Sequence, residues 1–208
     1  MTSRPPGGVV LYPTADGDAE APGATRLGMR LFLASLAVLF AGALVAFWVV
    51  RASATDWPPI GAPPMPRVLV LSTLLAAGAS ATLQAALTAI RRGNEPALGR
   101  RLALALALGT AFLACQALAW FQFFDRETFG RHLYGFTFYT LTGLHALHVI
   151  GGVVALAVVR IRARHHTYSW AAHAAVRSTA AYWHFLGAMW VVIYGTLAFA
   201  GRPGRLLG

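Results

Sequence analysis

The sequence predicts an all-α membrane protein, a bundle of five transmembrane helices. Hydrophobic residues make up 57% of the 208 residues and charged residues only 12%, well below the roughly 25% of a soluble domain. The apolar residues gather in long runs that can cross the roughly 30 Å hydrocarbon core of a bilayer as helices. None of the seven Asp and Glu residues lies inside such a run. This pattern is typical of an integral membrane protein.

The two chain ends are expected to lie outside the bundle. Residues 1–25 are rich in Pro, Gly and small residues and contain three acids, which favours a loosely ordered tail without a signal-peptide core. Residues 203–208 are too few to fold. We therefore expect one five-helix membrane domain over residues 26–202.

The spans and connections follow in order. Prolines crowd residues 51–67, and at that density they forbid a helix, so an extended surface loop is expected between the first two spans. Residues 91–101 form a short basic turn, and residues 160–177 form a basic loop that holds three histidines. The five spans are expected at 27–50, 68–90, 102–124, 133–159 and 179–200.

The charge of +10 is interpreted as a topology signal, with no nucleic-acid partner. All seventeen basic residues are arginines, and nearly all of them lie between the apolar runs. Eleven arginines fall on the side of the N-terminus and six on the other side. The positive-inside rule then predicts a bacterial inner (plasma) membrane protein with a cytoplasmic N-terminus and a periplasmic or extracellular C-terminus.

The fourth span has one polar face. On a 3.6-residue period, Thr142, His145 and His148 share a side with Gly152 and Ala155. Polar and small residues in a span usually face protein and not lipid. We expect these three polar residues to contact other helices or another subunit.

The histidines also raise the hypothesis of a stand-alone haem or metal enzyme, since imidazole is a common metal ligand. His145 and His148 stand on one helix face and cannot bind opposite sides of a haem iron. His184 lies about 8 Å into its span and His148 about 18 Å from the same side, a mismatch too large for metal bonds of about 2 Å. We therefore expect no catalytic residue, cofactor or metal in this chain. The single cysteine, Cys115, forms no metal motif.

The start of the last span predicts contacts with lipid or a partner subunit. Tyr182, Trp183 and His184 are expected near the headgroups, either as an aromatic belt or in a specific lipid or subunit contact. The basic loop next to them favours an anionic phospholipid. Its arginines are Arg160, Arg162, Arg164 and Arg177.

Two stretches carry a family resemblance. TFYTLTGLHALHVIGG (137–152) and AYWHFLGAMW (181–190) resemble the most characteristic segments of cytochrome c oxidase subunit III and its quinol oxidase counterpart. Weaker similarities run in the same order from residue 26 to the C-terminus, among them WPPIG (57–61) and CQALAW (115–120). The sequence is identified as a member of this family, in a five-helix form.

The resemblance implies a non-catalytic subunit of a haem-copper terminal oxidase in aerobic electron transport. Such subunits hold no redox centre, pack on the catalytic subunit I beside the other oxidase subunits, and bind phospholipid. Haem and copper are then expected in the partner subunits. A subunit III-like partner of a nitric oxide reductase stays open as an alternative.

The chain departs from the family at three acidic positions. Leu36, Ala119 and Gly187 stand where the family has carboxylic acids. Each change removes a costly buried carboxyl group. We therefore expect no proton-handling role for this chain.

Overall fold

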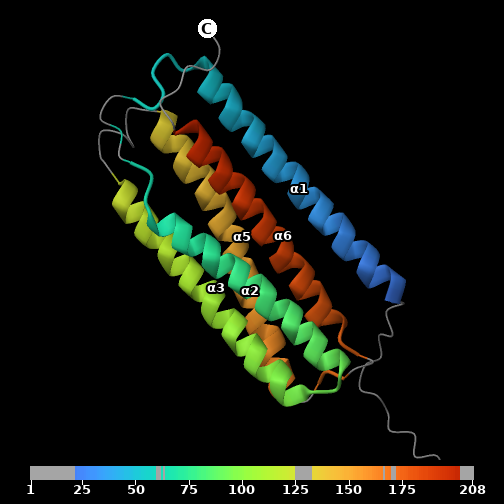
Figure 1. Cartoon of the computed structure of the whole chain (residues 1–208). Coiled ribbons are helices and arrows are strands. Elements are labelled where there is room, and N and C mark those ends of the chain that lie inside the picture. Colours follow the sequence, from blue (N-terminus) through green and yellow to red (C-terminus); the bar gives the residue numbers. More distant parts are fainter. Residues whose placement is uncertain are drawn as a thin grey trace, which may run out of the picture.

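Five long helices form an up-and-down bundle in the computed structural model (Figure 1). The structure describes residues 22–59, 62, 64–124, 133–165, 167–169 and 172–201. The helices are α1 (Pro22–Ser53), α2 (Val68–Arg91), α3 (Glu95–Phe123), α5 (Leu133–Arg164) and α6 (Ala174–Ala200). All five are long and apolar enough to cross a membrane. Even α2, the shortest with 24 residues, is about 36 Å long at 1.5 Å per residue. The predicted fold class is confirmed.

The helices extend further than the predicted spans. Residues 22–25 belong to α1 and not to a loose tail, and Arg100 and Arg101 lie in α3 and not in a turn. The predicted basic loop is likewise shorter, because α5 continues to Arg164 and α6 begins at Ala174. Hydropathy marks only the apolar part of a helix, whereas Ala and Arg continue the helix into the headgroup layer because both favour helical backbone. Residues 1–21 and 202–208 lie outside the described residues, so the proposed tails stay predictions.

The tightest connection joins α2 to α3. Gly93 adopts a φ of 68°, a conformation that glycine reaches without steric cost. The Asn94 side chain then accepts a hydrogen bond of 3.0 Å from the backbone N–H of Ala97 and caps α3. The Arg101 guanidinium donates back to the Ala85 carbonyl oxygen. These local contacts hold α2 and α3 as an antiparallel hairpin.

Helix α1 lies at the edge of the bundle, where it packs on α5 and α6 (Figure 1). All five helices contribute to the core, α1 through Leu36, Phe40 and Phe47, and the largest fully buried side chain is that of Trp190. Gly109 of α3 lies directly against the Trp183 ring, where a β-carbon would collide with the indole. The glycine therefore leaves room for the Trp183 ring, which reaches from α6 to the surface of α3.

Candidate functional site

The polar face of α5 points into the bundle, toward α3 and α6. Thr142 is fully buried and accepts a hydrogen bond of 3.0 Å from Trp120 Nε1, while its hydroxyl donates to the Phe138 carbonyl oxygen at 2.7 Å. The Tyr139 hydroxyl donates to the Trp120 carbonyl oxygen at 2.9 Å. Thr142 thus contacts another helix of its own chain.

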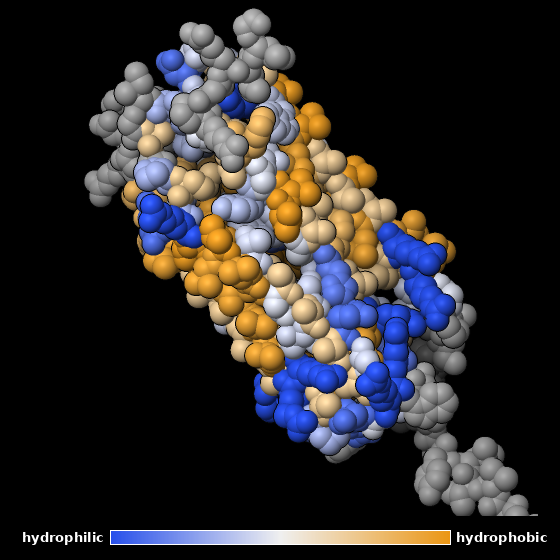
Figure 2. Space-filling model, viewed as in Figure 1, coloured by the Kyte–Doolittle hydropathy of each residue, from blue (hydrophilic) through white to orange (hydrophobic). Residues whose placement is uncertain are grey.

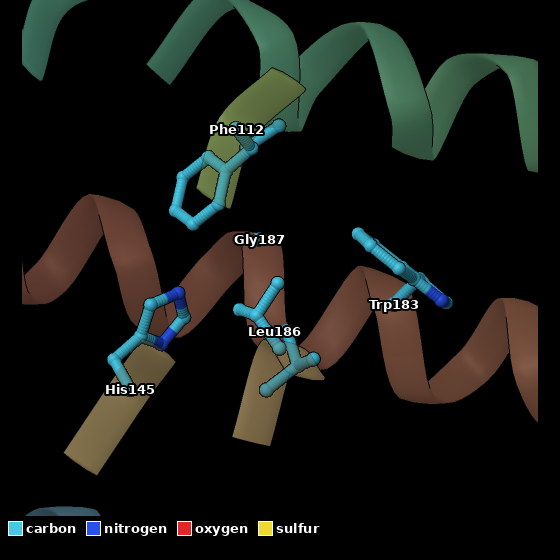
Figure 3. A pocket seen from close by; sticks show the side chains of 7 residues that line it. Phe112, His145, Trp183, Leu186 and Gly187 are labelled. Carbon is cyan, nitrogen blue, oxygen red and sulfur yellow. The ribbon is translucent and has the colours of Figure 1, made fainter. Parts of the chain in front are cut away.

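His145 is 1% exposed and is surrounded by rings. Its ring centroid lies 5.3 Å from that of Trp190, 5.8 Å from that of Phe112 and 6.1 Å from that of Phe40. Its Nδ1 is buried without a hydrogen-bond partner among the described residues. A cavity of about 10 Å³ lies beside it. Figure 3 shows the His145 and Phe112 rings at one end of this space and Trp183 at the other.

His148 is half-buried and engaged within its own helix. Its Nδ1 lies 2.7 Å from the Leu144 carbonyl oxygen, and its ring packs on Phe40 with centroids 5.2 Å apart. Since a carbonyl oxygen only accepts, Nδ1 carries the proton in this tautomer. The backbone carbonyl oxygen of His148 accepts a hydrogen bond of 2.9 Å from the Tyr182 hydroxyl.

Tyr182 and Trp183 lie inside the bundle, so the aromatic-belt interpretation is wrong for both. They are 9% and 4% exposed. The Trp183 indole N–H donates to the Gly152 carbonyl oxygen at 3.2 Å, one helical turn beyond the Tyr182 contact with His148. A β-carbon at Gly152 would lie 3.2 Å from the Tyr182 ring. Small residues on α5 therefore let both rings of α6 reach its backbone.

His184 points away from the other two histidines, toward α2. Its Nδ1 lies 3.1 Å from Ser80 Oγ and its Nε2 lies 3.4 Å from Gln84 Oε1. Within the described residues, no group of three or more His, Cys, Asp or Glu side chains is placed to hold a metal ion. Each of the three histidines is engaged by a different set of neighbours.

The positions that lack the family acids are closely packed. Leu36 is 6% exposed and Ala119 is fully buried. A β-carbon at Gly187 would lie 3.3 Å from Ser80 Oγ. A carboxylate at any of these places would displace apolar packing or meet the Ser80 hydroxyl.

Basic side chains gather where α1 and α6 begin. A pocket of about 330 Å³ is lined by Arg26 and Arg30 of α1 and by Arg177 and Ser178 of α6. Sequence reasoning did not place Arg26 and Arg30 beside Arg177, because it counted them as topology signals, with Arg30 also reaching the headgroups. The sequence does not show that the start of α1 lies beside the start of α6.

The predicted lipid-contact arginines divide into two groups. Arg160, Arg162 and Arg164 lie in the last turns of α5, whereas Arg177 lines the pocket between α1 and α6. Arg162 lies near Tyr168, which follows α5. Burial raises the pKa of the Tyr168 phenol above its usual value of 10.0, and the positive charge of Arg162 partly opposes this.

Two further pairs of side chains belong to the interior polar network, and none of the four was predicted as a site residue. The Trp190 indole N–H donates to Thr73 Oγ1 at 3.0 Å, and Gln116 Nε2 donates to Ser72 Oγ at 3.4 Å. Gln116 Oε1 is buried without a partner among the described residues. The sequence does show polar atoms of these residues inside apolar runs. It does not show which helix each polar atom would contact.

Comparison with known proteins gives a consistent result. A family model described as "Cytochrome c oxidase subunit III" matches residues 17–202. "Cytochrome c oxidase subunit 3" of Pelomedusa subrufa is 32% identical over 183 residues, covering 85% of this chain and 69% of that protein. "Probable cytochrome c oxidase subunit 3" of Nocardia farcinica is 30% identical over 180 residues, covering 86% and 89%. The Synechocystis sp. "Cytochrome c oxidase subunit 3" is 30% identical, covering 86% and 77%.

Proposed function

This chain belongs to the cytochrome c oxidase subunit III family and is a subunit III of a haem-copper oxidase, and we propose that it packs directly on catalytic subunit I and supports it without a redox centre of its own. The family supports the partner, and the contacts of the three intramembrane histidines support the lack of a redox centre. His145 lies among rings, His148 bonds within α5, and His184 pairs with α2. Imidazoles used for packing do not converge on one ion.

Purification of the chain in mild detergent tests this role. We expect it to copurify with a larger chain that carries haem and copper, and we expect the isolated chain to show no Soret band. Recovery as a stable monomer without partner would contradict the packing on subunit I. A Soret band that survives removal of all other subunits would instead support the stand-alone haem enzyme.

We further propose that the basic end binds an anionic phospholipid. The arginines Arg160, Arg162, Arg164 and Arg177 lie at the ends of α5 and α6, and Arg26 and Arg30 join Arg177 around one pocket. Each arginine near an anionic headgroup contributes roughly 1 kcal/mol. Because Tyr182 and Trp183 are turned into the bundle, the arginines and not these rings would contact the lipid.

Native mass spectrometry of the purified complex tests the lipid. We expect an anionic phospholipid to be retained by the wild type and lost after Arg26→Gln with Arg177→Gln. Arg162→Gln with Arg164→Gln tests the end of α5 separately. Arg67→Gln, next to α2 at its other end, is the matched control and should change nothing. Unchanged bound lipid in both double variants would leave the arginines as topology signals only.

The proposed orientation places this basic end in the cytoplasm. The arginines at the α2–α3 turn, at the end of α5 and at the start of α6 lie at one end of the bundle (Figure 1). This clustering supports a cytoplasmic N-terminus and a periplasmic or extracellular C-terminus. Protease added from outside should cut a tag at the C-terminus, and cleavage only from the cytoplasmic face would reverse the assignment.

A further inference from the structure

We propose that the face formed by α2 and α6 docks a transmembrane helix of a partner oxidase subunit, which presents a hydrogen-bond acceptor to the Gln84 amide. The inference rests on the proposed function and adds which surface of the chain is used. We call this surface the α2–α6 face. Its residues are Ser80, Ala81, Gln84, His184, Gly187 and Ala188.

A hydrogen-bond chain across the two helices determines what the partner must offer. With Gln84 Oε1 as acceptor, His184 Nε2 carries the proton, and the bare Nδ1 then accepts from the Ser80 hydroxyl. Both N–H groups of the Gln84 amide are left unused within the described residues, and the Gln84 side chain is exposed. The series of hydrogen bonds from Ser80 through His184 to Gln84 therefore ends on the Gln84 amide N–H groups, which are exposed at the surface.

The depth of this donor makes exposure to lipid costly. Gln84 stands seven positions before Arg91, and His184 stands seven positions after Arg177. At 1.5 Å per residue both lie about 10 Å below the arginines. The hydrocarbon core extends about 15 Å from its edge to its centre, so the amide lies in the outer part of the core, at the level where the Arg101 guanidinium reaches the Ala85 carbonyl oxygen. Water is scarce there, and an unused donor is costly.

The shape of the α2–α6 face suits a helix more than lipid tails. Ala81 of α2 and Ala188 of α6 are exposed about one helical turn deeper than the polar pair, and Gly187 lies against Ser80. Small residues let a second backbone come close enough for a side-chain amide to reach an acceptor on it. Figure 2 shows a pale band with blue patches along the bundle, flanked by orange surface.

Other outward surfaces look different. On α1 large apolar residues such as Val38, 73% exposed, stand among small ones such as Ala41 and Gly42, and α5 exposes Leu147 and Val154. Such side chains match lipid tails and need no partner. Among these outward surfaces the α2–α6 face stands out because it joins an unused amide donor to small neighbours.

A pair of tryptophan substitutions at similar depth tests the docking. Ala81→Trp places a bulky ring on the α2–α6 face, whereas Ala107→Trp places the same ring on exposed α3. Ala81 stands 12 positions before Gly93 of the α2–α3 turn and Ala107 stands 14 positions after it. The complex is purified through a tag on the catalytic subunit, and this chain is quantified per haem. We expect at least tenfold loss with Ala81→Trp, several-fold loss with Gln84→Leu, and wild-type retention with Ala107→Trp. Retention of Ala81→Trp, or equal loss of both tryptophan variants, would overturn the proposal.

A photo-crosslinking amino acid at the same two positions identifies the occupant without depending on affinity. In the purified complex, position 81 should crosslink to a transmembrane peptide of a partner subunit, and position 107 should not. Crosslinks from position 81 to lipid alone would refute the docking. The proposed function fails separately, if the wild-type chain itself does not copurify with a haem-containing subunit. Circular dichroism of the isolated variants checks that both tryptophans leave the helices folded.

Discussion

Helix α1 and the four-helix unit of α2, α3, α5 and α6 are held by different kinds of contact. The four helices are joined by hydrogen bonds between side chains and neighbouring helices, as from Trp183 to Gly152 and from Trp190 to Thr73. Helix α1 packs on the unit through rings, among them Phe32 against Tyr182 and Phe40 against His148. Because lipid is as apolar as a phenyl ring, this packing has no hydrophobic driving force and depends on close van der Waals contact between the rings. Directional bonds therefore specify the four-helix unit, while shape alone positions α1.

The largest expected effect comes from filling the space that Gly109 leaves for the Trp183 ring inside the four-helix unit. Gly109→Leu should push the Trp183 indole out of its place and cost about 3 kcal/mol or more of the free energy of unfolding, because the surrounding core is closely packed. Gly42→Leu on α1 is the matched control, since nothing lies within 4 Å of its position. Unfolding of both variants with a denaturing detergent compares them. Equal stability of the two would show that the unit is looser than described.

The next effect should loosen α1 alone. Phe40 is fully buried against His145, His148 and Phe185. Phe40→Ala should cost about 3 kcal/mol of α1 attachment. Hydrogen exchange should then speed up in α1 and stay slow in α3 and α6. Phe121→Ala, at a residue 80% exposed on α3, should change neither. Uniform acceleration over all helices would mean that α1 and the unit unfold together.

Removing one hydrogen bond from the four-helix unit should lower the free energy of unfolding by less than either substitution above. Thr142→Val keeps the shape of the side chain but leaves the indole N–H of half-buried Trp120 without its acceptor, which should lower the free energy of unfolding by about 1–2 kcal/mol. Trp120→Phe in addition should recover part of this loss, because the stranded donor is then gone. A double-mutant cycle measures the coupling energy between Thr142 and Trp120. A coupling energy near zero would show that this hydrogen bond does not help to specify the four-helix unit.

The smallest effects are expected at the two histidines of α5. His148→Leu should cost below about 1 kcal/mol, because Nδ1 bonds only to the carbonyl of its own helix. His145→Leu should be neutral or stabilising by up to about 1 kcal/mol, because it removes a buried nitrogen without a partner among the described residues. Detergent unfolding measures both. A loss above 2 kcal/mol at His145 would reveal a partner, such as a bound water, in the cavity beside it.

Sequence alone determined the five helices, because a chain in lipid must satisfy its own backbone, and apolar runs of this length can do so only as helices. It also placed Thr142 and His145 on an inward face, since helical periodicity is local. Helix ends were placed less well, as at Arg164 and Ala174, because hydropathy does not mark where an arginine-rich helix stops.

Only the tertiary structure decided which partner each polar residue has. The sequence grouped Tyr182, Trp183 and His184 at a membrane surface, yet the first two bond to α5 and the third turns to α2. Arg26 and Arg177 lie far apart in the chain and line one pocket. Adjacent residues on a helix point about 100° apart. The hydrogen-bond partner of each therefore depends on which helix lies on its side. Which helices are neighbours is decided by the packing of the whole bundle and cannot be derived from the sequence of one span.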